Sequence, residues 1–149
     1  MCNSCNYNNI LQEAGLDPTA HRLHILEVIG ANPSPLSATD VFKTMARNHR
    51  INRVTVYRIL DLLVEKNVLE RLSSGGRAAH YGLAPNEHHV RHPHFYCTNC
   101  GQMDCLQPES LAIDMAHLKK NFAGEIDRIE IRVDGTCKNC LRQQAEPRD

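Results

Sequence analysis

Two identical cysteine spacings are the first feature of this sequence that could do chemistry. Cys97-Thr-Asn-Cys100 and Cys137-Lys-Asn-Cys140 are Cys-x-x-Cys pairs, separated by residues patterned as a helix and a strand. Each pair can supply two thiolates from a tight turn, and zinc prefers four such ligands in a tetrahedron at about 2.3 Å. The spacing predicts a structural zinc site held by all four cysteines, with redox dithiols or buried thiols as the alternatives.

Histidines are concentrated between residues 80 and 94, where five of the nine lie. His92 and His94 are two residues apart, so both rings lie on the same face of an extended segment. Cys105 follows on the next expected strand, and imidazole with thiolate favours zinc over oxygen-preferring ions. These three residues predict a second metal site. A solvated linker is the alternative, which is preferred for His80, His88 and His89.

Basic residues gather in one stretch of the first half. Between Asp40 and Asp61 the chain has five Lys or Arg residues and no acidic residue. An arginine-rich helix can enter the major groove of double-stranded DNA, where Arg binds guanine through two hydrogen bonds. We therefore predict DNA contacts from one helix and, more weakly, from Arg22 and from Arg77 in a loop. The residues of that helix are Arg53, Thr55, Tyr57 and Arg58.

The elements that must position the basic stretch are three helices and a hairpin. Asp17 or Thr19 can begin a helix that ends near Gly30, Ser37 begins a capping-box sequence, and Asn52 can cap a helix reaching Lys66. Segments 68–72 and 79–83 are typical of strands joined by a Gly-rich loop. The pattern predicts a winged helix-turn-helix DNA-binding domain over residues 1–84, followed by a hinge over 85–91.

Residues 92–149 must hold the cysteines with a mixture of strands and helix. We expect strands at 95–97 and 102–106, an amphipathic helix beginning at Pro108 and an alternating strand at 127–133. These residues are too few for a comfortable independent core, and such segments often dimerise or bind metal. The fold class is therefore α+β, with a small C-terminal α/β domain for dimerisation and metal binding.

Composition limits the classes of protein that remain. The chain has 149 residues, 42% hydrophobic and 23% charged, with a formal net charge of zero. A large multidomain enzyme is excluded, and neither a signal peptide nor a membrane span is expected. We expect a cytoplasmic protein, in which seven cysteines indicate metal binding rather than disulfides. A third pair, Cys2 and Cys5, is interpreted as exposed thiols without a function.

Taken together, these motifs resemble the ferric uptake regulator family of dimeric, metal-sensing bacterial repressors. The resemblance spans about residues 10–141. It rests on the run from His92 to Gly101, on the second Cys-x-x-Cys pair, and on Thr55-Val-Tyr57-Arg58 after a basic helix-turn-helix. It implies a winged-helix domain, a C-terminal dimerisation domain, a four-cysteine structural zinc and a regulatory metal at the hinge held in part by His92 and His94.

The chain departs from the iron-sensing and peroxide-sensing members of that family. Cys105 stands where they usually have a carboxylate, and a histidine between their first two helices is missing here. Ala112 and Ile129 stand where many members have ligands of a further metal site, which we expect to be absent. These departures make the chain most similar to the zinc uptake regulator branch. In that branch Glu70 on the wing aligns with a position that can supply a ligand, and we take it as the fourth ligand of the hinge metal. His80, His88 and His89 are the alternatives for this fourth ligand.

The function expected from the sequence is that of a homodimeric repressor. With zinc at the hinge it would bind palindromic operator DNA and control zinc uptake genes. An iron, manganese or peroxide sensor of the same family is the alternative. A zinc deaminase is disfavoured because the chain lacks both the His-x-Glu and the Pro-Cys-x-x-Cys that this chemistry needs, so we do not expect an enzyme. A zinc-ribbon interaction module would leave the basic helix unexplained.

Overall fold

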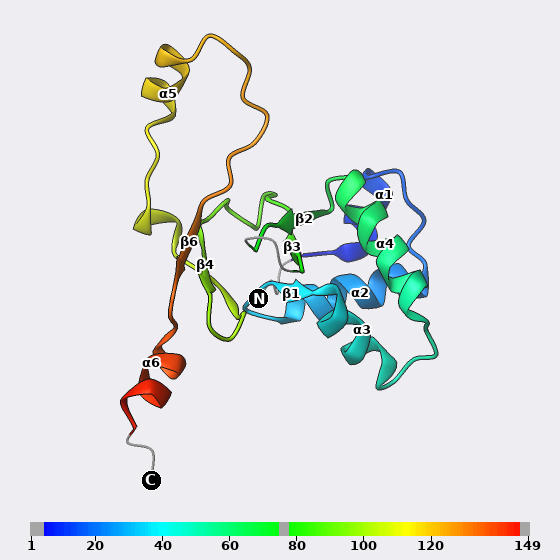
Figure 1. The fold of residues 1–149 in the computed structure, drawn as a ribbon. Coiled ribbons are helices and arrows are strands. Elements are labelled where there is room, and N and C mark those ends of the chain that lie inside the picture. Colours follow the sequence, from blue (N-terminus) through cyan, green and yellow to red (C-terminus); the bar gives the residue numbers. More distant parts are fainter. Residues whose placement is uncertain (1–4, 75–77, 147–149) are drawn as a thin grey trace. The chain divides into compact units, whose positions relative to one another are not determined.

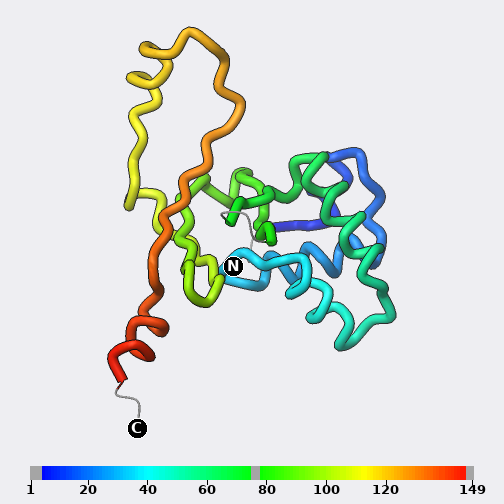
Figure 2. The backbone as a smooth tube through the Cα atoms, in the orientation of Figure 1, coloured from blue at the N-terminus to red at the C-terminus, as the bar shows by residue number. Residues whose placement is uncertain are grey.

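The computed structural model describes residues 5–74 and 78–146, in two units, Met1–Arg91 and His92–Asp149. Each unit is described by itself below, and the course of the chain through both can be followed in Figures 1 and 2. Arg77 and Cys2 lie outside the described residues. The predicted hinge, residues 85–91, is the last part of the first unit.

Polar side chains begin every helix of the first unit. Asn6, Thr19, Ser37 and Asn52 each accept a hydrogen bond from a backbone N–H of the first turn that would otherwise have no partner. The predicted caps at Ser37 and Asn52 are present, and Thr19 rather than Asp17 caps its helix. The helices are α1 (Tyr7–Glu13), α2 (Ala20–Ala31), α3 (Ala38–Ala46) and α4 (Arg53–Glu65).

The core of the first unit is formed by the apolar stripes of these helices. Leu60 and Leu63 of α4 are fully buried with residues of the other helices. The helix α1, which the sequence analysis did not predict, adds the buried Leu11 and packs Tyr7 closely against Gly30 of α2. The other fully buried residues on helices of this cluster are Ile25, Leu26, Val41, Met45 and Val56.

A three-stranded antiparallel sheet follows the helices and forms the wing. Its strands are β1 (Leu36–Ser37), β2 (Leu69–Leu72) and β3 (His80–Leu83), in the order β1-β3-β2. Leu69 of β2 is buried in the same core cluster as the helices, whereas Arg71 is exposed, so β2 contributes to this core through Leu69. The predicted winged helix-turn-helix is therefore present, with β1 as an additional strand.

A second three-stranded sheet organises residues 92–149. Its strands are β4 (His94–Cys97), β5 (Met103–Cys105) and β6 (Arg132–Gly135), in the order β5-β4-β6. β4 is antiparallel to β5 and parallel to β6. The helices of this unit are a 3₁₀ turn, η1 (Pro108–Ser110), α5 (Met115–Asn121) and α6 (Lys138–Ala145).

Two predicted elements of the second unit differ from the observed ones. The expected helix from Pro108 is interrupted, because Leu111 is extended (φ −138°) and a new helix begins at Asp114, which caps it. The expected strand at 127–133 starts only at Arg132. A strand needs a ladder partner as well as alternation, and β4, its partner, begins at His94 opposite Arg132.

Apolar side chains remain exposed on the second unit. Phe122 is 53% exposed and Leu111 42%. α5 lies at the far tip of a long excursion of the chain between β5 and β6, and the chain returns from it to β6 (Figure 1). Further exposed apolar residues of this excursion are Ile113, Met115 and Leu118. Among the described residues, none of the helices combines the length and the hydropathy needed to cross a membrane.

Candidate metal centres and nucleic-acid interface

Parallel pairing of β4 with β6 brings the two Cys-x-x-Cys pairs together. Cys97 ends β4 opposite Gly135, and Thr98 donates its backbone N–H to the Gly135 carbonyl at 2.9 Å. The chain then turns, so that Cys137 is the N-cap of α6 and Cys140 lies in its first turn. The turn after Cys97 closes at Gly101, whose φ of 79° favours glycine.

The four sulfur atoms have the spacing of a tetrahedral zinc site. Cys97 Sγ lies 3.8 Å from Cys140 Sγ, and Cys100 Sγ lies 3.8 Å from Cys137 Sγ. Zinc–sulfur bonds of about 2.3 Å place the corners of a tetrahedron about 3.8 Å apart. All four atoms lie within 4.8 Å of one another. This four-cysteine site (Cys97, Cys100, Cys137 and Cys140) therefore fits the zinc ion that the sequence predicts.

Backbone donors prepare one of these thiols to bind a cation. Hydrogen bonds from the backbone N–H groups of Cys100 and Cys137 lower the pKa of the Cys97 thiol to about 6. The Cys137 nitrogen lies 3.3 Å from Cys97 Sγ. Thiolate rather than thiol is the ligand of zinc, so the turn and the helix start favour the ionised form.

A second cluster brings together His92, His94 and Cys105, and is called the mixed-ligand site below. One ligand atom of each residue lies within 4.8 Å of the others. His94 pairs directly with Cys105 across β4 and β5, so their side chains share one face of the sheet. The two imidazole rings have centroids 4.6 Å apart. Two nitrogens and one sulfur at this spacing fit a borderline-soft metal such as zinc.

The mixed-ligand site keeps His94 in the neutral form that binds metals. Burial, together with the neighbouring charge of His92, lowers its pKa to about 4, whereas the Glu130 carboxylate acts in the opposite direction. His94 is only 4% exposed, while Cys105 is exposed. A metal can thus reach the site from the side of Cys105.

The other predicted ligands belong to the first unit. Glu70 is half-buried on β2. His80 is buried on β3, and burial lowers the pKa of its imidazole, with Asp40 acting in the opposite direction. His88 and His89 donate their backbone N–H groups to Asn86 Oδ1 at 2.7 and 3.0 Å. A ligand role for any of these four residues stays a prediction.

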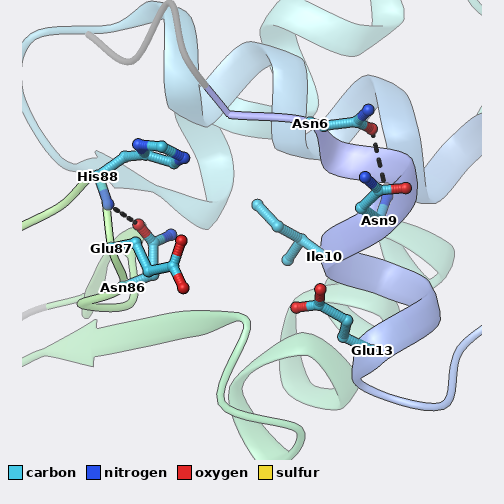
Figure 3. Close-up of a pocket in the computed structure, with 7 residues that line it drawn as sticks. All are labelled: Asn6, Asn9, Ile10, Glu13, Asn86, Glu87 and His88. Atoms are coloured by element: carbon cyan, nitrogen blue, oxygen red, sulfur yellow. Dashed lines mark hydrogen bonds between the residues drawn. The ribbon is translucent and has the colours of Figure 1, made fainter.

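The turn at Asn86 faces α1 across a pocket of about 260 Å³ (Figure 3). Ile10 and Glu13 of α1 line one side, and Glu87 and His88 line the other. All of these residues belong to the first unit. The start of the predicted hinge therefore lies across the pocket from α1, a helix that the sequence analysis did not predict.

The predicted DNA-contacting residues lie on or beside α4. Arg53 and Arg58 are exposed, and Thr55 and Tyr57 are half-buried. The Arg53 guanidinium lies 4.8 Å from the centre of the Phe42 ring of α3, and this cation–aromatic contact restrains the Arg53 side chain. Two side-chain hydrogen bonds lower the pKa of the Tyr57 phenol; the one with Thr39 has the larger effect and the one with Arg53 the smaller. The start of α4 is thus linked to α3 through polar and cation–aromatic contacts.

Two further observations concern the DNA-facing residues. Arg22 donates from Nη1 to the Asp17 carbonyl at 2.9 Å, so it also holds the start of α2. Val54 was missed by the sequence analysis although it is 57% exposed on α4. It lies four residues before Arg58 and so on the same helix face, and an exposed apolar side chain there can contact a thymine methyl group. The sequence did contain a signal for this role, because Val54 lies on the helix opposite the buried apolar residues.

The expectation for the N-terminal cysteines is wrong at Cys5. The sequence analysis interpreted Cys5 as an exposed thiol, whereas in the structure Cys5 is half-buried and disulfide-bonded. The reason for the error is that chain composition reports the average redox environment and not the local approach of two sulfur atoms. Nothing in either metal site depends on Cys5.

Comparison with known proteins matches these features to one family. The sequence model of the ferric uptake regulator family matches residues 13–132. A ferric uptake regulation protein from Yersinia pestis is 28% identical over 143 residues, which cover 93% of this chain and 94% of that protein. A protein of the same description from Campylobacter jejuni is 26% identical over 143 residues, with 94% and 89% covered.

Solved structures of the same kind share the fold. The ferric uptake regulator of Vibrio cholerae has a TM-score of 0.71 at 24% identity, covering 89% of this chain and all of that chain. A zinc uptake regulator complexed with zinc and DNA has a TM-score of 0.65 at 23% identity, with 93% and 92% covered. The similarity extends over both units.

Proposed function

Because this chain belongs to the ferric uptake regulator family, whose members are metal-dependent transcriptional regulators and not enzymes, we propose that it is a zinc-responsive repressor. It acts in the cytoplasm, binds palindromic operator DNA as a homodimer when zinc is bound, and controls zinc uptake genes. The observation that carries the proposal is the mixed-ligand site, which supplies a second metal position besides the four-cysteine site.

The donor atoms of the mixed-ligand site support zinc as the regulatory metal. Thiolate and imidazole are softer donors than carboxylate and water, which suit manganese better. Cys105 is the residue that makes the difference, because a carboxylate there would leave a harder set. The printed description of one structural neighbour, a zinc uptake regulator bound to zinc and DNA, is compatible with this choice.

The mechanism follows from where the ligands stand in the chain. His92 is the first residue of the second unit and directly follows the predicted hinge. With a metal bound, His92 is held beside Cys105 of β5, so the end of the hinge is fixed to the second sheet. A fixed hinge narrows the set of separations between the two recognition helices of a dimer and raises the population that matches an operator.

DNA contact is assigned to α4. Its exposed face carries Arg53, Val54 and Arg58, where bidentate Arg–guanine and apolar–thymine contacts are possible. Thr55 and Tyr57 are suited to phosphate contacts near the helix start. Arg22 and Arg77 are proposed as secondary contacts.

The decisive experiment measures DNA binding and metal content on one sample. The protein is used to select a palindromic duplex from random DNA in the presence of zinc, and its affinity is then measured at buffered free zinc, iron(II) and manganese. Zinc should raise the affinity at the lowest free concentration. His92→Ala should leave a dimer with zinc in the four-cysteine site but remove the response to added metal.

Two variants separate metal sensing from DNA contact. Arg58→Ala should weaken specific binding by about 1–3 kcal/mol and relax the preference at one base pair, with zinc affinity unchanged. Restoration of binding by iron(II) or manganese but not by zinc would replace zinc as the signal. A full metal response in His92→Ala would overturn the assignment of the mixed-ligand site.

A further inference from the structure

Building on the proposed function, we propose that Glu130 is the fourth ligand of the regulatory metal, in place of Glu70 of the wing. The mixed-ligand site has three protein ligands, and a tetrahedral zinc ion held by protein alone needs one more. Glu130 belongs to the same unit as the other three ligands.

Strand register brings the segment that contains Glu130 next to the segment that carries the two histidines. His94 of β4 is the direct partner of Arg132 of β6, and the two strands are parallel. Side chains alternate with a period of two along each strand. Glu130 lies two residues before Arg132, and His92 lies two residues before His94, so they occupy equivalent positions just before the paired strands. The His94 N–H donates to the Ile131 carbonyl at 3.0 Å, which keeps the two segments together at this level.

Electrostatic interactions agree with the register. The Glu130 carboxylate acts directly on the His94 imidazole, and it also acts on the Arg132 guanidinium. The Glu130 side chain is only 27% exposed. Because β4 lies between β5 and β6, the segment that carries Glu130 is on the opposite side of β4 from Cys105.

Glu130 makes a weak ion pair with Arg128. Its Oε2 atom lies 3.7 Å from Nη2 of Arg128, whose side chain is 41% exposed. An ion pair this long and this exposed contributes little to stability. The Glu130 carboxylate is not grouped with the three ligand atoms as the side chains stand, so metal binding by Glu130 requires it to turn away from Arg128 toward them.

The resulting ligand set is balanced in charge and confined to one sheet. Zinc with one thiolate, one carboxylate and two neutral imidazoles has no net charge, whereas the three ligands alone would leave one positive charge in a partly buried place. Ligands would come from β4, β5 and the segment leading into β6. Regulation would then order the end of the hinge on the second unit, and would need no ligand from the wing.

The test compares carboxylate variants of the full-length protein whose four-cysteine site is filled with zinc. Zinc affinity is measured by competition with a chromophoric chelator, and cobalt(II) spectra report the ligands. Glu130→Gln should weaken zinc binding at least about tenfold, the lower range for groups that only support a ligand, and should keep the thiolate-to-cobalt band from Cys105. Glu130→His should retain tight binding because it restores a ligand. Glu70→Gln and Glu125→Gln, the latter an exposed glutamate of the same unit, should bind zinc as the unmodified protein does.

The outcomes separate this inference from the proposed function. If Glu130→Gln binds zinc like Glu125→Gln while His92→Ala loses the site, the inference is overturned and the proposed function stands. A loss in Glu70→Gln that equals or exceeds that in Glu130→Gln also overturns it, in favour of the wing. If His92→Ala has no effect either, the mixed-ligand site itself is wrong and the proposed function fails with it.

Discussion

At the scale of single residues, the two metal sites differ in how their ligands are covered. Cys97 and Cys140 are buried, and backbone N–H groups hold the Cys97 thiolate in place before any metal binds. The mixed-ligand site combines the buried His94 with the exposed Cys105. A closed set of four thiolates suits a permanent structural ion, whereas an open edge suits exchange with free metal in the cell.

Replacement of one structural ligand should unfold the second unit. Cys97→Ser leaves three thiolates and a buried hydroxyl, and zinc binding in such sites is directly coupled to folding. We expect loss of one zinc per chain and loss of the dimer, measured by metal analysis and sedimentation. Cys105→Ser is the matched control and should keep the dimer and the zinc of the four-cysteine site, losing only the zinc of the mixed-ligand site; loss of the dimer in both variants would contradict a distinct structural site.

His80 predicts a pH dependence of stability. Burial lowers its pKa in the folded protein, while the unfolded chain has the ordinary value of about 6.5. As the pH falls through about 6.5, the unfolded state takes up a proton that the folded state does not, so stability decreases. The free energy of unfolding of the unmodified protein should therefore fall more between pH 7.5 and 5.5 than that of His80→Gln. Parallel curves would show that His80 does not contribute.

At the scale of elements, α1 connects the first unit's core to the start of the hinge. Leu11 is fully buried, and Tyr7 packs against Gly30 of α2. On its other side, α1 lines the pocket opposite Glu87 and His88. A change in the position of α1 would therefore alter the surroundings of Glu87 and His88, which precede the mixed-ligand site in the chain.

The contact between α1 and α2 depends on the absence of a side chain at residue 30. A Cβ atom there would collide with the ring and hydroxyl of Tyr7, so Gly30→Ala should displace α1. Overpacking of this kind costs about 1–3 kcal/mol, which chemical denaturation would measure. The double variant Tyr7→Leu/Gly30→Ala removes the collision and should recover part of the loss. If the double variant is no more stable than Gly30→Ala, the loss of stability does not come from the collision with Tyr7.

At the scale of the whole molecule, the second unit exposes a set of apolar side chains. Its excursion between β5 and β6 exposes Leu111, Ile113, Met115, Leu118 and Phe122. Apolar groups gathered in this way usually mark an interface. A second copy of the chain is the partner expected for a family whose members bind DNA as dimers, and the operator symmetry follows from the dimer.

A charge in this apolar set should separate the copies. Phe122 is 53% exposed, so Phe122→Asp does not disturb the core of one chain but would bury a carboxylate in a dimer. We expect monomers at micromolar concentration in analytical ultracentrifugation, with the four-cysteine zinc retained and DNA affinity strongly reduced. Lys119→Asp, an exposed position on the same excursion, is the control; a dimer in Phe122→Asp would exclude this surface.

The sequence by itself determined the features that depend on near neighbours. The caps at Ser37 and Asn52, the apolar stripe of α4 and the wing strands follow from spacings of two to four residues, which local hydrogen bonding and burial impose. The four-cysteine cluster was predictable for a similar reason, because each pair is a short motif and zinc requires four ligands. The grouping of His92, His94 and Cys105 was also predicted from alternation and ligand chemistry.

Only the tertiary structure decided the features that depend on distant partners. Alternation suggested a strand at 127–133, but its start at Arg132 is fixed by the start of β4. The parallel pairing of β4 with β6 joins residues nearly forty positions apart, and no local pattern encodes that register. The same pairing brings the segment that contains Glu130 next to His94, which no spacing in the sequence indicates. Local periodicity tells which face a side chain occupies, whereas packing decides what it meets there.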